Sequence, residues 1–223
     1  MFVLTPRREP LLWIQLLGIG FIPLEVILLR LILSGADLGP IPFIERLIIW
    51  SMSVLIPTLA LWEKPGDWGS IILLRTPPKG RSELQLKLSF LQKNIINRLS
   101  LLIGATSLLI IFWWADHSAL LVRDLSPLKD SSRFITLLTS IPILALLTWQ
   151  WHQLTQSIWL LTRSKETLKE SPAITEKDLR TQRRCIGISL LNISELDFSP
   201  LVTFTSTSQD PDQPSQDQNN SDN

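Results

Sequence analysis

Four long apolar runs constrain this chain more than any other feature of its sequence. They cover residues 11–33, 41–62, 99–115 and 134–155. A helix needs about 20 apolar residues to cross a hydrocarbon core of roughly 30 Å, a length that buried helices of soluble proteins rarely reach without charges. The runs therefore predict an all-α integral membrane protein, a four-transmembrane-helix bundle. They argue against an ordinary soluble enzyme.

The segments outside these runs are polar. We expect an N-terminal segment at residues 1–10, a membrane region at 11–163 that includes a loop at 63–98, and a small segment at 164–202. Residues 203–223 consist mainly of Ser, Thr, Gln, Asn, Asp and Pro, without a basic residue. Such a segment cannot bury enough apolar surface to offset its ordering entropy, so we expect a disordered low-complexity tail.

Basic residues predict the orientation of the bundle. Sixteen Lys and Arg residues lie before the first run, between the second and third runs, and after the fourth, whereas three lie in the two opposite loops. Lys and Arg near membrane helices favour the cytoplasmic side, so we predict that both termini are cytoplasmic. This distribution accounts for the basic residues of a chain whose net charge is only +1, and nucleic-acid binding is not needed to explain them.

Two of the segments assigned to the cytoplasm have helical patterns. Leu84, Leu88 and Leu91 recur at spacings of three and four, which predicts an amphipathic helix over residues 81–98 that continues into the third span. Its apolar face suits either a surface of anionic lipid or packing against the bundle. Farther along, Thr175 followed by Asp178 resembles a capping box, so a helix is expected from residue 176 to about 184, followed by an apolar segment at 185–193.

Tryptophans mark the ends of the predicted spans. Trp13, Trp62 and Trp68 lie at the ends assigned to the cytoplasm, and Trp113 and Trp114 lie at the opposite end of the third run. Indole rings are enriched at the headgroup level of bilayers, so we interpret these residues as interface anchors.

Four charged residues inside the runs form a predicted intramembrane charge cluster: Glu25, Arg30, Glu45 and Arg46. Charges in a membrane span are costly and need partners. Arg30 and Glu45 lie at similar distances from the outer ends of their runs, so they could pair across the helices, and Arg46 is long enough to reach towards the deeper Glu25. We therefore predict two neutralising pairs that fix the register of a helical hairpin. The alternative makes Glu25 a proton or cation site.

Prolines inside three of the runs predict helix kinks at Pro23, Pro57 and Pro142. Each removes one helical hydrogen bond and leaves carbonyl groups that need other partners. Transporters use broken helices in this way, but proline is also common in ordinary membrane helices.

No pattern predicts a catalytic, cofactor-binding or metal site. His117 and His152 are the two histidines, and the predicted topology puts them on opposite sides of the membrane, so they cannot share a metal. Asp116 and His117 are expected to cap the outer end of the third span. Cys185 is the sole cysteine, and no nucleophile–base pair is evident, so we expect a protein that is not an enzyme.

The stretch from Glu9 to Gly18, with the sequence EPLLWIQLLG, resembles the cyanobacterial low-complexity tail membrane protein family. Further agreement comes from the segments Pro23-Leu24-Glu25, Pro42 with Glu45, Leu55-Ile56-Pro57 and Lys64-Pro65. Specific likeness covers about residues 1–80, and Gln15 stands where the family often has histidine. The resemblance implies a cyanobacterial integral membrane protein of the thylakoid or plasma membrane. It supplies no chemistry, because the family has no established activity.

These observations favour a non-enzymatic, multi-pass membrane protein that serves as an assembly, scaffold or accessory factor of a larger membrane complex. The expected partners are the lipid bilayer and another membrane protein, with no cofactor, nucleic acid or identified small-molecule substrate. The alternative is a small transporter or ion-translocating subunit centred on the intramembrane Glu25.

Overall fold

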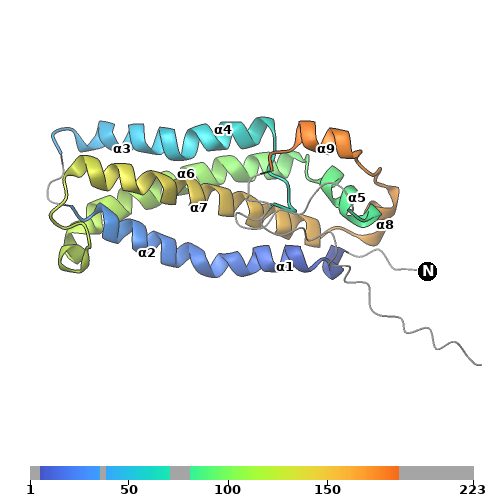
Figure 1. Ribbon diagram of the computed structural model, residues 1–223, viewed down its shortest axis with the longest axis horizontal. Coiled ribbons are helices and arrows are strands. Elements are labelled where there is room, and N and C mark those ends of the chain that lie inside the picture. The colour runs from blue at the N-terminus through green and yellow to red at the C-terminus, as the bar shows by residue number, and fades with distance from the viewer. Residues whose placement is uncertain (1–5, 36–38, 71–80, 186–223) are drawn as a thin grey trace, which may run out of the picture.

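The computed structural model describes residues 6–35, 39–70 and 81–185, and Figure 1 shows long helices lying side by side. Four helical runs are long and apolar enough to cross a membrane: Pro10–Leu33, Pro42–Glu63, Ile95–Leu125 and Arg133–Leu161. For the described residues this confirms the prediction of an all-helical chain with four helices able to span a membrane. The predicted boundaries between membrane and soluble segments stay a prediction.

The first run, which follows a short 3-10 turn at Pro6–Arg8, consists of two helices in line, α1 (Pro10–Leu17) and α2 (Phe21–Leu33). Pro10 opens α1 at a position where a missing N–H costs no hydrogen bond. A 3-10 turn at Gly18–Gly20 joins the helices just before Pro23, which lacks the N–H that would continue the α-helical ladder.

The second run is also interrupted near a proline. It comprises α3 (Pro42–Trp50), a π-helical turn (Ser51–Leu55) and α4 (Ile56–Glu63). Pro57 cannot donate to the carbonyl of Ser53, and the adjacent Ile56 N–H bonds to the carbonyl of Ser51, five residues back. The ladder therefore changes register within the apolar part of the span.

The third and fourth runs form the centre of the bundle. The third consists of α6 (Ile95–Ser118) and a 3-10 turn (Ala119–Leu125), and the fourth is the single helix α7 (Arg133–Leu161). Helix α7 contacts α1, α2, α3, α4 and α6, so it is the helix against which the others pack. Pro142 lies inside α7, which continues as one helix through this position.

Apolar side chains fill the space between these helices. Leu29, Phe112 and Leu144 are fully buried in one cluster contributed by α2, α6 and α7. At Gly104 a Cβ atom would overlap the indole of Trp151, so the missing side chain lets α6 approach α7 closely. Small residues serve the same purpose in membrane helix pairs generally.

Three short helices gather at one end of the bundle, together with the described N-terminal residues (Figure 1). They are α5 (Glu83–Leu91), α8 (Lys165–Glu170) and α9 (Glu176–Gln182). We call this end the cap end, and the end with the connections after Leu33 and after Leu125 the loop end. A parallel β-bridge between Gly66 and Arg184 ties the segment after α4 to the segment after α9.

The predicted continuous helix over residues 81–98 is wrong, because α5 and α6 are separate. Ser82 and Gln85 form a capping box at the start of α5, and Asn94 caps α6 by accepting from the N–H of Ile96. Leu88 of α5 packs in a cluster with Leu160 and Leu168, so the apolar stripe packs against the bundle.

Two other local predictions have opposite outcomes. The helix after Thr175 is confirmed: the Thr175 hydroxyl accepts from the N–H of Asp178, and α9 follows. The assignment of Trp68 as an interface anchor is wrong, since the indole is buried and donates to the Ser89 hydroxyl at 2.9 Å. The predicted segment at 185–193 and the tail at 203–223 lie outside the described residues, apart from Cys185 itself.

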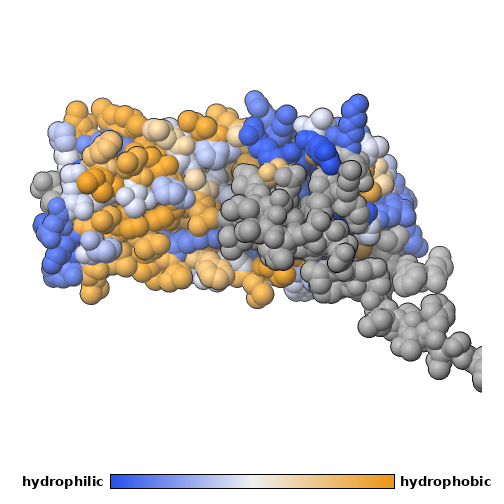
Figure 2. All heavy atoms as spheres, viewed as in Figure 1, coloured by the Kyte–Doolittle hydropathy of each residue, from blue (hydrophilic) through white to orange (hydrophobic). Residues whose placement is uncertain are grey.

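Figure 2 shows hydrophobic side chains over much of the visible face along the long helices, with hydrophilic side chains toward the two ends. Exposed apolar residues occur on every long run, for example Leu24, Ile48, Ile110 and Leu138. An apolar belt between polar ends is the pattern that a bilayer stabilises. The side of the membrane on which each end lies stays a prediction.

Candidate functional site

A group of charged side chains joined by several ion pairs lies at the loop end of the bundle. Asp116, on the last turn of α6, is 1% exposed. Arg133, the first residue of α7, holds it with two parallel bonds, from Nη1 to Oδ1 at 2.6 Å and from Nη2 to Oδ2 at 3.0 Å. Bidentate guanidinium–carboxylate pairs combine strong hydrogen bonds with a fixed orientation.

Two residues of α3 complete this group. Arg46 donates from Nε to Asp116 Oδ2 at 2.5 Å, and Arg133 donates from its own Nε to Glu45 Oε2 at 3.2 Å. We call Glu45, Arg46, Asp116 and Arg133 the loop-end ion network. Its formal charges sum to zero, and it joins α3, α6 and α7. Moving these helices apart would separate the paired charges and leave them buried without a counter-ion. The network therefore restrains the relative positions of the three helices.

Both predicted charge pairs are wrong. Glu45 pairs with Arg133 instead of Arg30, and Arg46 pairs with Asp116 instead of Glu25. The expectation that Asp116 caps its helix fails for the same reason, because its carboxylate is used between helices. The matching depths of Glu45 and Arg30 in the membrane stay a prediction, and depth carries no information on which way each side chain faces.

Arg30 lies outside the loop-end ion network. Its Nε and Nη2 donate to the backbone carbonyl of Ser118 at 3.3 and 3.2 Å. The guanidinium carbon lies 5.3 Å from the centre of the Trp114 ring, within the range of a cation–π contact. No carboxylate of the described residues lies within ion-pair distance of Arg30.

Glu25 lies in the apolar part of the first run. Gln150 of α7 donates from Nε2 to Glu25 Oε1 at 2.5 Å. The second carboxylate oxygen, Oε2, is buried without a hydrogen-bond partner among the described residues. The carboxylate is therefore only half satisfied inside the bundle, and this is the feature that keeps an ion-site interpretation of Glu25 open.

A second polar group, which the sequence analysis missed, lies at the cap end. We call it the cap-end polar layer, and its buried members come from five segments: Gln15, Asp67, Arg81, Gln92, His152, Gln153, Gln156 and Ser157. Four of them occur on α7 at spacings of four, His152 with Gln156 and Gln153 with Ser157. This spacing at the end of an apolar run was a signal that these side chains share faces of one helix.

The bonds of the layer hold non-helical backbone in place. Gln153 donates from Nε2 to the carbonyls of Asp67 and Ser70, each at 3.2 Å, and Gln15 donates to the carbonyl of Trp68. Arg81 forms an ion pair with Asp67 beneath the same segment. Buried backbone carbonyl groups outside helices need such hydrogen-bond partners, so the layer fixes the segment after α4 against α7.

Glu9, which precedes α1, adds a titratable group to the cap end. Its side chain is largely buried, and Gln85 of α5 donates to Glu9 Oε2 at 3.3 Å. Burial raises the pKa of this carboxyl above its ordinary value of 4.5, and the hydrogen bond from Gln85 opposes part of the shift.

The sequence profile of the low-complexity tail membrane protein-like family matches residues 8–195. The chain belongs to this family. No curated protein and no solved structure matches it. The family prediction made from the first 80 residues is therefore confirmed, over a much longer part of the chain.

This low-complexity tail membrane protein-like chain is an integral membrane protein, as the family and its four apolar helices indicate. The matched residues include the loop-end ion network and the cap-end polar layer. Both polar groups thus lie in the part of the chain that matches the family, whereas residues 196–223 fall outside the match.

One small cavity in the low-complexity tail membrane protein-like chain adjoins the cap-end polar layer. His152, Gln92 and Asn97 are among its lining residues, and it has a volume of about 10 Å³. His152 Nδ1, Gln92 Oε1 and Asn97 Oδ1 are each buried without a hydrogen-bond partner among the described residues. One donor and two acceptors beside a space near the lower limit for water suit a single water molecule.

The described residues contain no group of three or more His, Cys, Asp or Glu side chains that could hold a metal ion. The three prolines lie on different helical runs. Pro23 and Pro57 follow breaks in the α-helical hydrogen-bond pattern, and Pro142 lies within the continuous helix α7. Kinks at these three positions stay a prediction, as does a role for them in transport.

Proposed function

We propose that this membrane protein is not an enzyme and acts as an assembly, scaffold or accessory factor of a larger membrane complex. The observation that carries the proposal is the loop-end ion network, in which Arg46, Asp116 and Arg133 are at most 9% exposed and neutralise one another with Glu45. A path for ions or solutes through the loop end would break the bonds between these buried charges. The network therefore suits a rigid bundle.

The outer faces of the bundle supply surface for lateral contacts. Only 17% of the most apolar 18-residue window of the first run is buried inside the bundle. Leu24 and Ile27 of α2 are exposed there, and lipid or the helices of a partner protein would cover them. A bundle whose loop end is held by buried ion pairs and whose apolar outer surface is extensive acts most directly through such contacts.

Site-specific photo-crosslinking in the native membrane tests this function. A photoreactive residue at exposed Leu24, Ile103 or Leu138 should give a protein adduct of reproducible mass from at least one position, whereas buried Leu29 should not. Only lipid adducts at all exposed positions, together with isolation of the chain alone from mild detergent, would overturn the proposal.

The second candidate function is ion or proton translocation centred on Glu25. The specific observation in its favour is the buried Oε2 atom of Glu25 without a bonding partner among the described residues. Against it, Glu25 lines neither the small cap-end cavity nor the larger groove at the loop end. Glu25→Gln in proteoliposomes would abolish an ion flux under this function, and Glu45→Gln provides a comparison at a charge used for structure.

Location and orientation complete the proposal. A cyanobacterial thylakoid or plasma membrane follows from the family resemblance, and cytoplasmic termini follow from the distribution of Lys and Arg. Alkaline phosphatase fused after residue 223 should be inactive, and a fusion after Asp130 should be active. The reverse pattern would invert the topology.

A further inference from the structure

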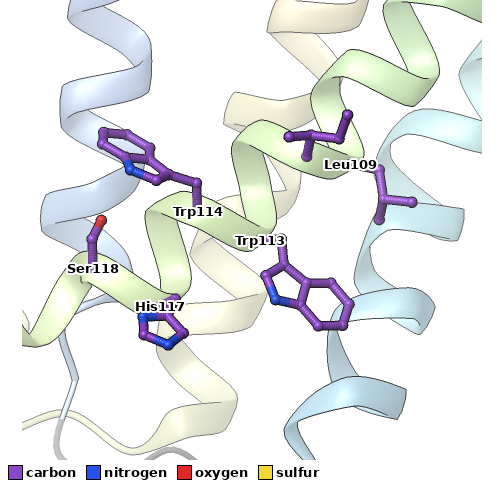
Figure 3. Close-up of a pocket in the computed structure, with 6 residues that line it drawn as sticks. Leu109, Trp113, Trp114, His117 and Ser118 are labelled. Carbon is purple, nitrogen blue, oxygen red and sulfur yellow. The ribbon is translucent and has the colours of Figure 1, made fainter.

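A groove at the loop end opens on the outer surface of α6. It has a volume of about 590 Å³ and is lined by Leu109, Ile110, Trp113, Trp114, His117 and Ser118. Figure 3 shows the two indoles pointing to opposite sides of α6. Trp114 lies beside Arg30 of α2, and Trp113 packs edge-on against Phe43 of α3 at 5.6 Å between ring centres.

The polarity of the groove changes along the helix axis. Leu109 and Ile110 lie toward the middle of α6, and His117 and Ser118 form its last two residues at the loop end. The difference of about eight residues corresponds to roughly 12 Å along an α-helix. An occupant with an apolar chain and a polar head, oriented like the lipids around it, would match this gradient.

The charges beside the groove indicate which polar head group its occupant should carry. Two guanidinium groups flank the indoles, Arg46 at 4.9 Å from the Trp113 ring centre and Arg30 at 5.3 Å from that of Trp114. Arg46 is neutralised within the loop-end ion network, whose charges sum to zero. Arg30 donates hydrogen bonds only to the Ser118 carbonyl among the described residues, so one positive charge that no described carboxylate compensates lies beside two lining residues of the groove, Trp114 and Ser118.

We propose that this groove binds an anionic glycerophospholipid, with one acyl chain between Trp113 and Trp114 and the phosphate beside Arg30. Arg30 is partly buried near a membrane interface, where a charge lacking a counter-ion is unfavourable and a lipid phosphate supplies one. The exposed His117 adds a hydrogen-bonding group at the same end of the groove. A zwitterionic lipid fits the shape equally well and has the same phosphate, but its own ammonium group already neutralises that phosphate, so the bound pair keeps the net positive charge of Arg30.

Native mass spectrometry of the full chain tests the proposal. The protein in detergent is mixed with equal amounts of phosphatidylglycerol and phosphatidylcholine that have the same acyl chains, and the bound lipids are compared. We expect a preference for phosphatidylglycerol. Arg30→Gln should reduce that preference about tenfold, a typical effect of one charge-assisted hydrogen bond, and Arg30→Lys should retain most of it.

Arg123→Gln is the matched control, because Arg123 is an exposed arginine in the 3-10 turn at the same end. It should leave the preference unchanged. A groove-filling Ile110→Trp variant, which changes no charge, should lower the number of bound lipids and serves as a second test if Arg30→Gln does not fold.

Phosphatidylglycerol with brominated acyl chains should quench tryptophan fluorescence, and Trp114→Phe should lose part of that quenching.

Three results would overturn the proposal. One is equal binding of the two lipids by the natural chain, and another is the same loss of preference in Arg30→Gln and Arg123→Gln. The third is a crosslink between two copies of the chain through a photoreactive residue at Ile110, which would identify the occupant of the groove as a second protein molecule.

Discussion

Asp116 and Arg133 form a bidentate ion pair that joins the last turn of α6 to the first residue of α7. The two bonds measure 2.6 and 3.0 Å, and Asp116 also accepts from Arg46. The two residues are separated in sequence by a connection that contains a 3-10 turn, so the pair closes the loop end of the helical hairpin. The central position of Asp116 makes it the residue whose loss the network should tolerate least.

We expect Asp116→Asn to destabilise the protein by about 3–5 kcal/mol, because two buried guanidinium groups lose their shared counter-ion. Unfolding of the purified protein by sodium dodecyl sulfate, followed by circular dichroism, measures the change. Asp124→Asn alters an exposed carboxylate at the same end and should have almost no effect. Equal unfolding of the two variants would mean that the network contributes little to stability.

Gly104→Ala should destabilise the contact between α6 and α7 by about 1–3 kcal/mol, the usual cost of overpacking a close contact. The added Cβ would overlap the indole of Trp151, and moving that ring would strain its 2.8 Å hydrogen bond to the Ser100 carbonyl. Gly20→Ala is the control, since no heavy atom lies within 4 Å of a Cβ placed there. Thermal denaturation in micelles distinguishes the two, and an unaffected Gly104→Ala variant would show that Trp151 can move freely.

The raised pKa of Glu9 predicts a pH dependence of stability. Between the ordinary value of 4.5 and the higher pKa in the folded state, the folded chain binds more protons than the unfolded chain, so stability falls as pH rises through this window. The loss is complete above the pKa of the folded state. Glu9→Gln should therefore be more stable than the natural chain at neutral pH and show no such gain below pH 4.5.

Unfolding measured from pH 4 to 8 checks this prediction for Glu9. Glu83→Gln is the control, because it removes a carboxylate at the same end of the bundle that is mainly exposed, at the start of α5. A stability difference between Glu9→Gln and the natural chain that does not vary with pH would contradict the assignment to Glu9.

Arg183 should hold α9 against the cap end. Its side chain is buried and donates from Nη2 to the carbonyl of Ser89 in α5 at 2.6 Å. We expect Arg183→Gln to increase amide hydrogen exchange in Glu176–Gln182 about tenfold or more, because a hydrogen bond from a charged group contributes about 1.5–3 kcal/mol. Arg180→Gln, at an exposed position of α9, should leave the exchange rates unchanged. Similar exchange in both variants would assign the docking of α9 to its other contacts.

Several features of the fold follow from short stretches of sequence. Apolar length predicts four helices able to span a membrane, because the hydrocarbon core sets how many apolar residues a span needs. Thr175 and Asp178 predict the start of α9, since a cap depends on residues three positions apart. The predicted continuity of α5 with α6 fails because Asn94 starts a new helix, a local signal that the apolar stripe obscured.

The partners of the charges could not be predicted in this way. Glu45 and Arg46 are adjacent, yet Glu45 bonds to Arg133 and Arg46 to Asp116. Which acid meets which base depends on the rotation of each helix about its axis, and that rotation is set by packing across the whole bundle. The cap-end polar layer was missed for the same reason, because Gln15 and Ser157 become neighbours only when α1 packs on α7.

The sequence by itself therefore determined the class of protein, the number of helices able to span a membrane and the family, because these depend on composition and on local spacing. The tertiary structure decided the pairing of Asp116 with two arginines, the isolation of Arg30 from carboxylates among the described residues, and the groove beside it. These arise from contacts between residues far apart in the chain, whose distances no linear pattern specifies.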